Sequence, residues 1–339
     1  MHKRAPTIVA VLTPLAYIAR RWTPSPRTLQ LAALIAVLAS VLIVVTGGAV
    51  RLTGSGLGCD TWPKCTDNSL IATPAQGIHG AIEFSNRMLT YVICAAVGWA
   101  IIAARCAKPR RTGLTRLAWS QFWLVMGNAV LGGITVKAGL NPWTVAGHLL
   151  LAVGLLTVTT LTWLRTREGD GPPRPRVPRP VHKLAWAIVL TTGVLMVAGT
   201  VVTGTGPHAG DSSDVPRMPF KWADTVLVHE VFAWIVCALA VAMWLVLRAV
   251  DAPRDTRVIS RNLLLILLAQ GAVGYAQYLT DLPEVVVGIH MLGLTLVWIG
   301  VLRMFVCLRE RPEITPDIPA QANQQGQSGQ SDQPVSAAV

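Results

Sequence analysis

The sequence is poor in charged residues, which make up 14% of its 339 residues, whereas hydrophobic residues make up 52%. An ordinary water-soluble domain has about 25% charged residues, because its surface must be solvated. A disordered chain has a much lower content of hydrophobic residues than this sequence. The composition therefore excludes a disordered chain, argues against a single soluble domain and favours a protein that lies in a lipid bilayer.

Acidic residues are also scarce relative to basic ones, 17 against 29, so the formal net charge is +12. A basic excess can indicate nucleic-acid binding or the cytoplasmic loops of a membrane protein. The positions of the charges decide between these two. As shown below, they favour the membrane protein, so we expect no nucleic-acid partner.

Eight apolar stretches are long enough to cross about 30 Å of hydrocarbon as helices of roughly 20 residues. They cover residues 29–50, 79–104, 114–136, 143–164, 183–203, 224–247, 262–280 and 285–307. The sequence thus predicts an all-α integral membrane protein with eight transmembrane helices. The apolar segment Thr7–Ala19 is too short to span, and we interpret it as an interfacial helix or a plain tail rather than a cleaved signal.

The basic residues are concentrated on one side of the predicted membrane. Of the 29 Lys and Arg residues, 23 lie in the two terminal segments and around the loops after the second, fourth and sixth spans. The opposite loops hold Arg51, Lys64, Lys137, Arg217 and Lys221. Loops rich in Lys and Arg stay in the cytoplasm. We therefore expect a multi-pass protein of the cell membrane with both termini cytoplasmic.

Cysteine is rare, with six residues, and two of them, Cys59 and Cys65, share the first outer loop. The compartment outside the cytoplasm is oxidising, so this pair can form a disulfide, although two unrelated thiols remain the alternative. The other four lie in spans or at their cytoplasmic ends, and we interpret them as packing residues.

The two halves of the chain resemble each other. The matching positions are Gly132, Leu140 and His148 with Gly274, Leu282 and His290, and Asn86 and Cys94 with His229 and Cys237, at equal spacings. Two tandem four-helix bundles related by internal duplication are therefore predicted.

The expected organisation has five parts. A cytoplasmic N-terminal segment (1–28) precedes the N-terminal half (29–164), and a cytoplasmic linker (165–182) leads to the C-terminal half (183–308). The tail (309–339) is rich in Gln, Ser and Pro, a composition typical of disorder.

Ionisable residues inside membrane spans are costly and by default indicate function. Apart from residues within about one turn of a span end, those in the predicted spans are Glu83, Arg87, His148, His229, Glu230 and His290, with His79 at the edge of a span. All lie on even-numbered spans, roughly 6–15 Å below the outer end at 1.5 Å per residue. Four helices are therefore expected to present polar groups at one level.

In the second half, His229 and His290 occupy equivalent places on two helices. Imidazoles that face each other across a bundle can be the axial ligands of a six-coordinate haem iron. Zinc is less favoured because its sites need three or four protein ligands. A hydrogen bond to a neighbouring helix remains the alternative for each histidine taken alone.

The first half differs, because Asn86 stands at the position of His229, whereas His148 corresponds to His290. His79, Glu83 and Asn86 follow i, i+4, i+7 spacing and share a helix face, which we expect to point toward His148. A carboxylate beside a weakly ligated iron suits chemistry better than electron transfer. The alternative for Glu83 is an ion pair with Arg87, four residues later.

Around these residues the chain resembles the haem A synthase family, membrane enzymes that convert haem O to haem A. The resemblance covers roughly residues 29–308. Its motifs are GGAVRLTGSGLGC at 47–59, WPKC at 62–65, EFSNR at 83–87, LGGITV at 131–136 before His148, and QYLT at 277–280 before His290.

The resemblance implies oxidation of a haem O methyl group to a formyl group through a hydroxylated intermediate. The C-terminal half would hold a haem b that transfers electrons, with its iron between His229 and His290. The N-terminal half would receive haem O, with Glu83 essential for the oxidation. The substrate site would also include His148, a possible ligand of the haem O iron, together with His79, Asn86 and Arg87, and both haem sites would lie toward the extracytoplasmic side.

The chain departs from the family in two places. Many members have a histidine at the position of Asn86, so an iron ligand is not assigned there, and His79 or His148 alone is left for that role. Some members have a second cysteine pair in the loop that here spans Gly204–Ala223 and contains no cysteine.

The resemblance also implies haem O synthase and cytochrome oxidase assembly factors as partners, besides the lipid bilayer and a second copy of the chain. Two other functions fit the residues. One is a quinol-linked electron carrier that holds haem b without modifying haem. The other is a transporter, since repeats and intramembrane polar residues occur in that class as well.

Overall fold

The computed structural model describes residues 14–313, and in this range eight helices are long and apolar enough to cross a membrane. They are α2 (Pro26–Leu52), α3 (Gly77–Cys106), α4 (Thr112–Lys137), α5 (Pro142–Arg165), α6 (Arg179–Thr205), α7 (Trp222–Ala249), α8 (Arg254–Leu279) and α9 (Glu284–Cys307). The short elements are α1 (Pro14–Arg21), η1 (Pro74–Gln76), β1 (Arg174–Pro175) and β2 (Arg309–Glu310). The prediction of an all-α, eight-helix membrane protein is confirmed.

Local sequence sets several of the helix ends. The Ser25 side chain accepts a hydrogen bond from the Thr28 backbone N–H, and Pro26 is the first residue of α2. Asn141 and Pro142 begin α5 in the same way. A polar cap followed by proline satisfies or removes backbone donors that have no partner in the first turn.

One helix end differs clearly from the prediction. Helix α8 begins at Arg254 rather than near residue 262. Its first turns carry Arg254, Arg257 and Arg261 and therefore do not belong to an apolar stretch. The helix therefore extends beyond its apolar part.

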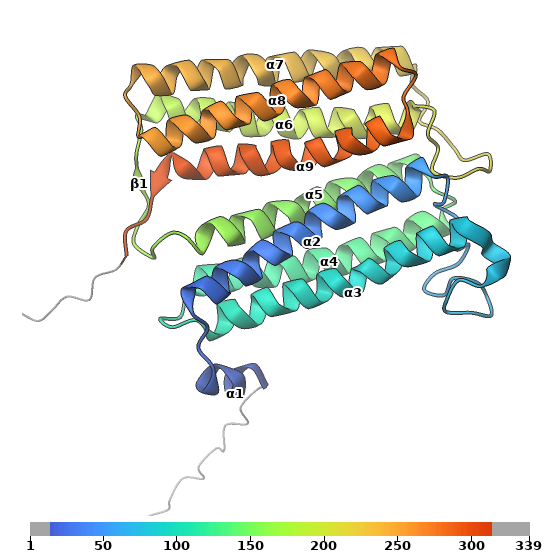
Figure 1. Ribbon diagram of the computed structural model, residues 1–339, viewed down its shortest axis with the longest axis horizontal. Coiled ribbons are helices and arrows are strands. Elements are labelled where there is room, and N and C mark those ends of the chain that lie inside the picture. The colour runs from blue at the N-terminus through green and yellow to red at the C-terminus, as the bar shows by residue number, and fades with distance from the viewer. Residues whose placement is uncertain (1–13, 314–339) are drawn as a thin grey trace, which may run out of the picture.

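The helices form two bundles that lie side by side, α2–α5 and α6–α9 (Figure 1). Contacts between the bundles come from α2 and α5 on one side and from α6 and α9 on the other. Each bundle has its own cluster of buried apolar side chains, but Val37, Val153 and Leu156 of the first bundle belong to the cluster of the second. The two halves thus share part of one core.

The outer surfaces of the bundles are apolar. Trp123 on α4 is 68% exposed and Leu190 on α6 is 63% exposed, and many other large apolar side chains are exposed on the spanning helices. Water-soluble proteins rarely expose contiguous apolar surfaces of this extent, so the protein is a multi-pass membrane protein.

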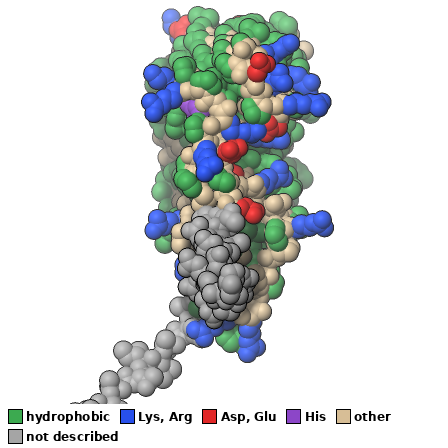
Figure 2. All heavy atoms as spheres, turned by 90° about the vertical axis from the view of Figure 1, so that its left-hand side faces the viewer, with side chains coloured by type: hydrophobic (Ala, Val, Ile, Leu, Met, Phe, Trp, Pro, Cys, Tyr) green, Lys and Arg blue, Asp and Glu red, His purple; other side chains and the backbone are tan. Residues whose placement is uncertain are grey.

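At one end of the bundles, here called the basic end, Lys and Arg side chains surround the surface (Figure 2). Helix α1, β1 and β2 lie at this end (Figure 1). Arg111 and Arg165 form ion pairs with Asp170 here, and Arg176 pairs with Asp255.

The described parts of the predicted N-terminal and C-terminal segments lie at the same end. Residues 309 and 310, which fall in the tail expected to be disordered, pair as β2 with β1 of the linker, so that expectation is wrong for these two residues. Backbone pairing with the linker orders them. The rest of the tail from residue 314, and residues 7–13 of the segment Thr7–Ala19, lie outside the described residues, whereas Pro14–Arg21 is helical.

The turns before α5 and before α9 have the same backbone. Gly139 and Leu140 have φ of 59° and 55°, and Asp281 and Leu282 have φ of 58° and 60°. The Leu140 N–H donates to the Thr135 carbonyl and the Leu282 N–H to the Gln277 carbonyl. Left-handed residues other than glycine are uncommon, so a left-handed leucine at the equivalent place of both turns is an expected property of duplicated units.

Candidate functional site

Glu83 lies in α3 near the end opposite the basic end, and its buried carboxylate is held on two sides. Oε2 accepts a hydrogen bond from the Cys59 backbone N–H at 2.5 Å. Oε1 accepts two from the Arg87 guanidinium, from Nη2 at 2.5 Å and from Nε at 3.1 Å. The ion pair between Glu83 and Arg87, considered above as an alternative, is therefore present in the fold.

Arg87 also attaches the first outer loop to α3. Its guanidinium donates to the carbonyls of Cys59, Thr61 and Lys64. Cys59 and Cys65 are both buried and joined by a disulfide. The carboxylate of Glu83, the disulfide loop and Arg87 thus form one connected unit.

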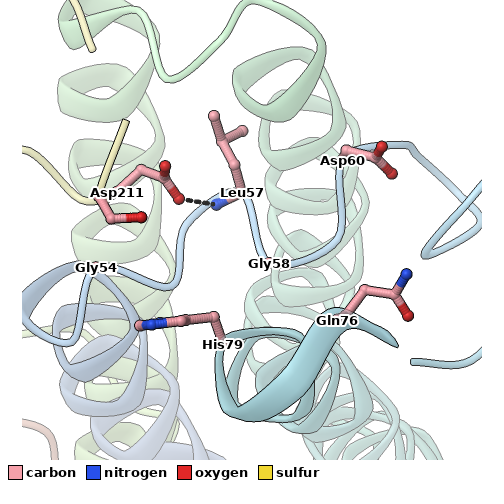
Figure 3. A pocket seen from close by; sticks show the side chains of 8 residues that line it. Gly54, Leu57, Gly58, Asp60, Gln76, His79 and Asp211 are labelled. Carbon is pink, nitrogen blue, oxygen red and sulfur yellow. Dashed lines mark hydrogen bonds between the residues drawn. The ribbon is translucent and has the colours of Figure 1, made fainter. Parts of the chain in front are cut away.

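His79 lies one turn before Glu83, but its ring points to the loops rather than into the bundle. Its Nδ1 is 2.9 Å from the Ser55 hydroxyl oxygen. The ring lines a cavity of about 300 Å³ together with Gly54, Leu57, Gly58, Asp60, Gln76, Asp211 and Ser212 (Figure 3).

Asp211 connects the two halves at this cavity. Its Oδ1 accepts a hydrogen bond from the Leu57 backbone N–H, drawn in Figure 3, and the Gly56 N–H donates to the Gly210 carbonyl. Burial raises the pKa of Asp211, but hydrogen bonds from Ser213 and Leu57 outweigh it, so the pKa lies below its ordinary value of 3.8. The carboxylate is therefore ionised at neutral pH.

The structure does not bring all the predicted residues of the first half into direct contact. Among the described residues, no hydrogen bond joins His148 to His79, Glu83 or Asn86. The buried Nδ1 of His148 and the buried Oδ1 of Asn86 have no hydrogen-bond partner in the described part of the chain. Buried polar atoms are almost always satisfied, so these two suit a group that the protein binds.

In the second half, His229 of α7 and His290 of α9 face each other. Their ring centres are 6.5 Å apart and their planes make an angle of 61°. The Nδ1 of His229 is buried without a hydrogen-bond partner among the described residues. The Nδ1 of His290 is buried without a partner among residues 14–313.

At three of the four equivalent positions, those of His148, His229 and His290, the imidazole packs against a glycine of the preceding helix, which is here called its glycine seat. An added Cβ would lie 3.1 Å from His148 at Gly132, 3.2 Å from His229 at Gly199 and 3.4 Å from His290 at Gly274. Gly132 and Gly274 stand out in the sequence as repeated residues. Gly199 is not part of such a sequence repeat, and its contact with His229 is seen only in the fold.

The geometry of the second half fits a haem iron. Metal–imidazole bonds are about 2 Å long and a ring nitrogen lies about 1 Å from its ring centre, so two axial imidazoles have centres about 6 Å apart. A porphyrin supplies the other four ligands itself. By contrast, the described residues contain no group of three or more His, Cys, Asp or Glu side chains that could hold a metal ion.

Comparison with known proteins gives two kinds of match. The family model COX15-CtaA, described as cytochrome oxidase assembly protein, matches residues 30–302. A haem A synthase of Rhizorhabdus wittichii is 28% identical over 348 aligned residues, which cover 84% of this chain and 97% of that protein.

Other relatives match over shorter parts. A haem A synthase of Geobacillus thermodenitrificans is 29% identical over 136 residues, 39% of this chain and 42% of that protein. A protohaem IX farnesyltransferase of Halobacterium salinarum is 28% identical over 192 residues, 48% of this chain and 42% of that protein. The chain therefore spans about two fifths of the length of these two relatives.

Proposed function

The chain belongs to the COX15-CtaA family of cytochrome oxidase assembly proteins, and we propose that it is a haem A synthase. The reaction is the oxidation of a methyl group of haem O to a formyl group through a hydroxylated intermediate. The observation that carries the proposal is the pairing of His229 with His290 at 6.5 Å, in a chain whose first half has a buried carboxylate instead of a second such pair.

In the C-terminal half, His229 and His290 would hold the iron of a haem b, which exchanges single electrons when bound. The seats at Gly199 and Gly274 keep both rings close to the neighbouring helices. The Nδ1 atoms of both rings are buried without a hydrogen-bond partner among the described residues.

In the N-terminal half, haem O would bind beside His148. The unpartnered atoms of His148 and Asn86 favour this position. Asn86 offers a hydrogen-bonding amide where many members of the family have a histidine, so His148 is the proposed ligand of the substrate iron. His79 is held by Ser55 at the outer cavity and is assigned no iron in this proposal.

Glu83 is the proposed catalytic residue. Its carboxylate is 5% exposed and is fixed by the Cys59 N–H and by Arg87. A carboxylate held in this way can accept a proton from the substrate carbon or stabilise positive charge that develops there. Arg87 would position this carboxylate and keep the disulfide loop over the site.

The proposed placement is in the cell membrane with both termini in the cytoplasm. The Lys and Arg side chains around the basic end support it (Figure 2). The disulfide and the Glu83 unit lie at the other end, which is then the extracytoplasmic side. Similarity to a protohaem IX farnesyltransferase over part of the chain is consistent with haem O synthase and cytochrome oxidase assembly factors as partners.

The decisive test is Glu83→Ala in the full-length protein. We expect haem O oxidation to fall at least a hundredfold, because the general base contributes roughly 10²–10⁴, while the absorption spectrum of bound haem b stays unchanged. Arg87→Lys is the matched variant: it keeps a positive charge but loses the fork that holds Glu83, so partial activity is expected. Wild-type haem A yield from Glu83→Ala would refute the proposal.

One observation favours a second function, a haem b electron carrier that does not modify haem. Both oxygens of Glu83 are engaged in hydrogen bonds within the protein, as in a purely structural ion pair. Extraction of the pigment separates the two functions. A synthase yields traces of haem O or haem A besides haem b, whereas a carrier yields haem b alone.

A further inference from the structure

Helices α7 and α8 carry a hydrogen-bonded cluster of Glu230, Trp234 and Tyr275 that the proposed function does not use. The Tyr275 hydroxyl donates to Oε1 of Glu230. The Trp234 indole N–H lies 3.2 Å from the Tyr275 hydroxyl oxygen and 3.4 Å from the same carboxylate oxygen. Glu230 is half-buried, whereas Trp234 is 59% and Tyr275 45% exposed. Two exposed aromatic rings thus flank a carboxylate.

This aromatic–carboxylate cluster lies next to the two facing histidines. Glu230 follows His229 in the chain, and Tyr275 follows Gly274, the seat of His290. Helices α7 and α8 lie on the side of the second bundle that faces away from the first bundle (Figure 1). Glu230 is eight residues from the start of α7, or about 12 Å into the apolar layer. A carboxylate at this depth is costly and indicates function.

The first half has no such cluster at the equivalent place. In the register of the repeat, Arg87 corresponds to Glu230 and Gly133 to Tyr275. There, Arg87 holds the disulfide loop, and the Trp62 indole packs directly against Gly133. The loop therefore covers that face of α3 and α4. Among the described residues, the corresponding loop, Gly204–Ala223, makes no hydrogen bond to the cluster on α7 and α8.

We propose that this cluster binds the headgroup of a lipid-soluble quinol that reduces the haem held by His229 and His290. The ligand must arrive through lipid, stack on exposed aromatic rings and present a hydroxyl group to a carboxylate, and a quinol ring does all three. The inference rests on the proposed function, because that function supplies the one-electron centre beside the cluster.

The chemistry balances with these residues. A quinol loses two electrons and two protons to become a quinone. Each electron would reduce one ferric iron to ferrous iron, so one quinol can reduce the haems of two protein molecules. The two protons are released to water, and the Glu230 carboxylate accepts the hydrogen bond from the quinol hydroxyl that orients the ring.

The first measurement is photolabelling of the purified full-length protein with a short-chain azidoquinone, followed by peptide mapping. We expect label on the α7 and α8 peptides that contain Trp234 and Tyr275, reduced at least tenfold in Glu230→Gln and Tyr275→Phe. Tyr278→Phe is the control, because Tyr278 is also exposed on α8 but stacks on Trp222 instead. Label on other helices, or label unchanged in both variants, would overturn the proposal.

The second measurement is the rate at which decylubiquinol reduces the bound haem, with dithionite as a reductant that needs no site. We expect the rate to saturate with quinol in the wild type and to fall at least tenfold in Glu230→Gln, while dithionite reduces both proteins fully. Equal rates in the two proteins would overturn the electron-transfer step. A wild-type protein without a haem spectrum would contradict the proposed function instead, and the photolabelling would still decide whether this cluster binds a quinone.

Discussion

His148, His229 and His290 each pack against a glycine of the helix before their own. At the fourth equivalent position the chain has Asn86, whose buried Oδ1 has no partner among the described residues. The difference between the halves is therefore one of side-chain chemistry at this position. On this asymmetry we base the proposal that the second half holds the iron and the first half receives the substrate.

At this scale, His229→Ala or His290→Ala should abolish the low-spin haem spectrum, because each variant removes one of two axial ligands. The control is His182→Ala, since His182 lies in the first turns of α6 near the basic end. The measurement is the absorption spectrum of the purified, reduced protein. A low-spin spectrum that survives in either variant would reject these residues as ligands.

Gly132→Ala should weaken haem O binding about tenfold while leaving the haem b spectrum intact. The new Cβ would lie 3.1 Å from the His148 ring, which must shift, and overpacking costs about 1–3 kcal/mol. Titration of haem O into the purified protein, followed by absorbance, measures the effect. Gly113→Ala in the same helix has open space around the added Cβ and should bind like wild type. Equal affinity of both variants would contradict a tight seat for His148.

At the scale of elements, the first outer loop and the start of α3 behave as one unit. The guanidinium of Arg87 joins three backbone carbonyls of the loop to the carboxylate of Glu83, and the Cys59 N–H reaches the same carboxylate. Because charge-assisted hydrogen bonds are short and strong, the position of Glu83 depends on the conformation of the loop.

Cys59→Ser should therefore lower haem O oxidation at least tenfold and destabilise the loop by about 2 kcal/mol, the chain-entropy value for a short closed loop. Bound haem b should be unaffected, because the loop belongs to the other half. Product yield and thiol labelling with and without reductant measure the two effects. Cys94→Ser, at a free cysteine of α3, is the control. If unreduced wild-type protein labels at both Cys59 and Cys65, the disulfide is absent.

At the scale of the whole molecule, two bundles of similar connection have different surfaces at the disulfide end. The first bundle is covered there by the disulfide loop, whereas the second leaves Trp234 and Tyr275 exposed. The matching left-handed turns at Leu140 and Leu282 support internal duplication. In the proposed function, divergence of the two copies would leave one half to hold a haem and the other to modify one.

The orientation of the molecule can be tested with reporter fusions. A fluorescent protein fused at the C-terminus should fluoresce, because the basic end is expected in the cytoplasm. Alkaline phosphatase inserted after Asp67, in the disulfide loop, should be active, because that enzyme needs an oxidising compartment. The reversed pattern would overturn the proposed topology and with it the side on which the haem sites open.

Much of this architecture follows from sequence alone. The eight spans and the expected sides of the loops depend on local composition, because an apolar stretch of about 20 residues satisfies its backbone internally as a helix and lysine and arginine resist translocation. The residues Glu83, His148, His229 and His290 stand out for the same local reason, since polar groups in apolar spans are rare.

Contacts between distant segments were decided only by the tertiary structure. Four such contacts join residues of different elements. They are the 6.5 Å distance between the ring centres of His229 and His290, the packing of His229 on Gly199, the hydrogen bond from the disulfide loop to Glu83, and the hydrogen bond between Glu230 and Tyr275. Helix packing sets these distances through the shapes of many side chains at once. The scarcity of charge therefore reduced the candidate site residues to a few, and the packing of eight helices determined which of them meet.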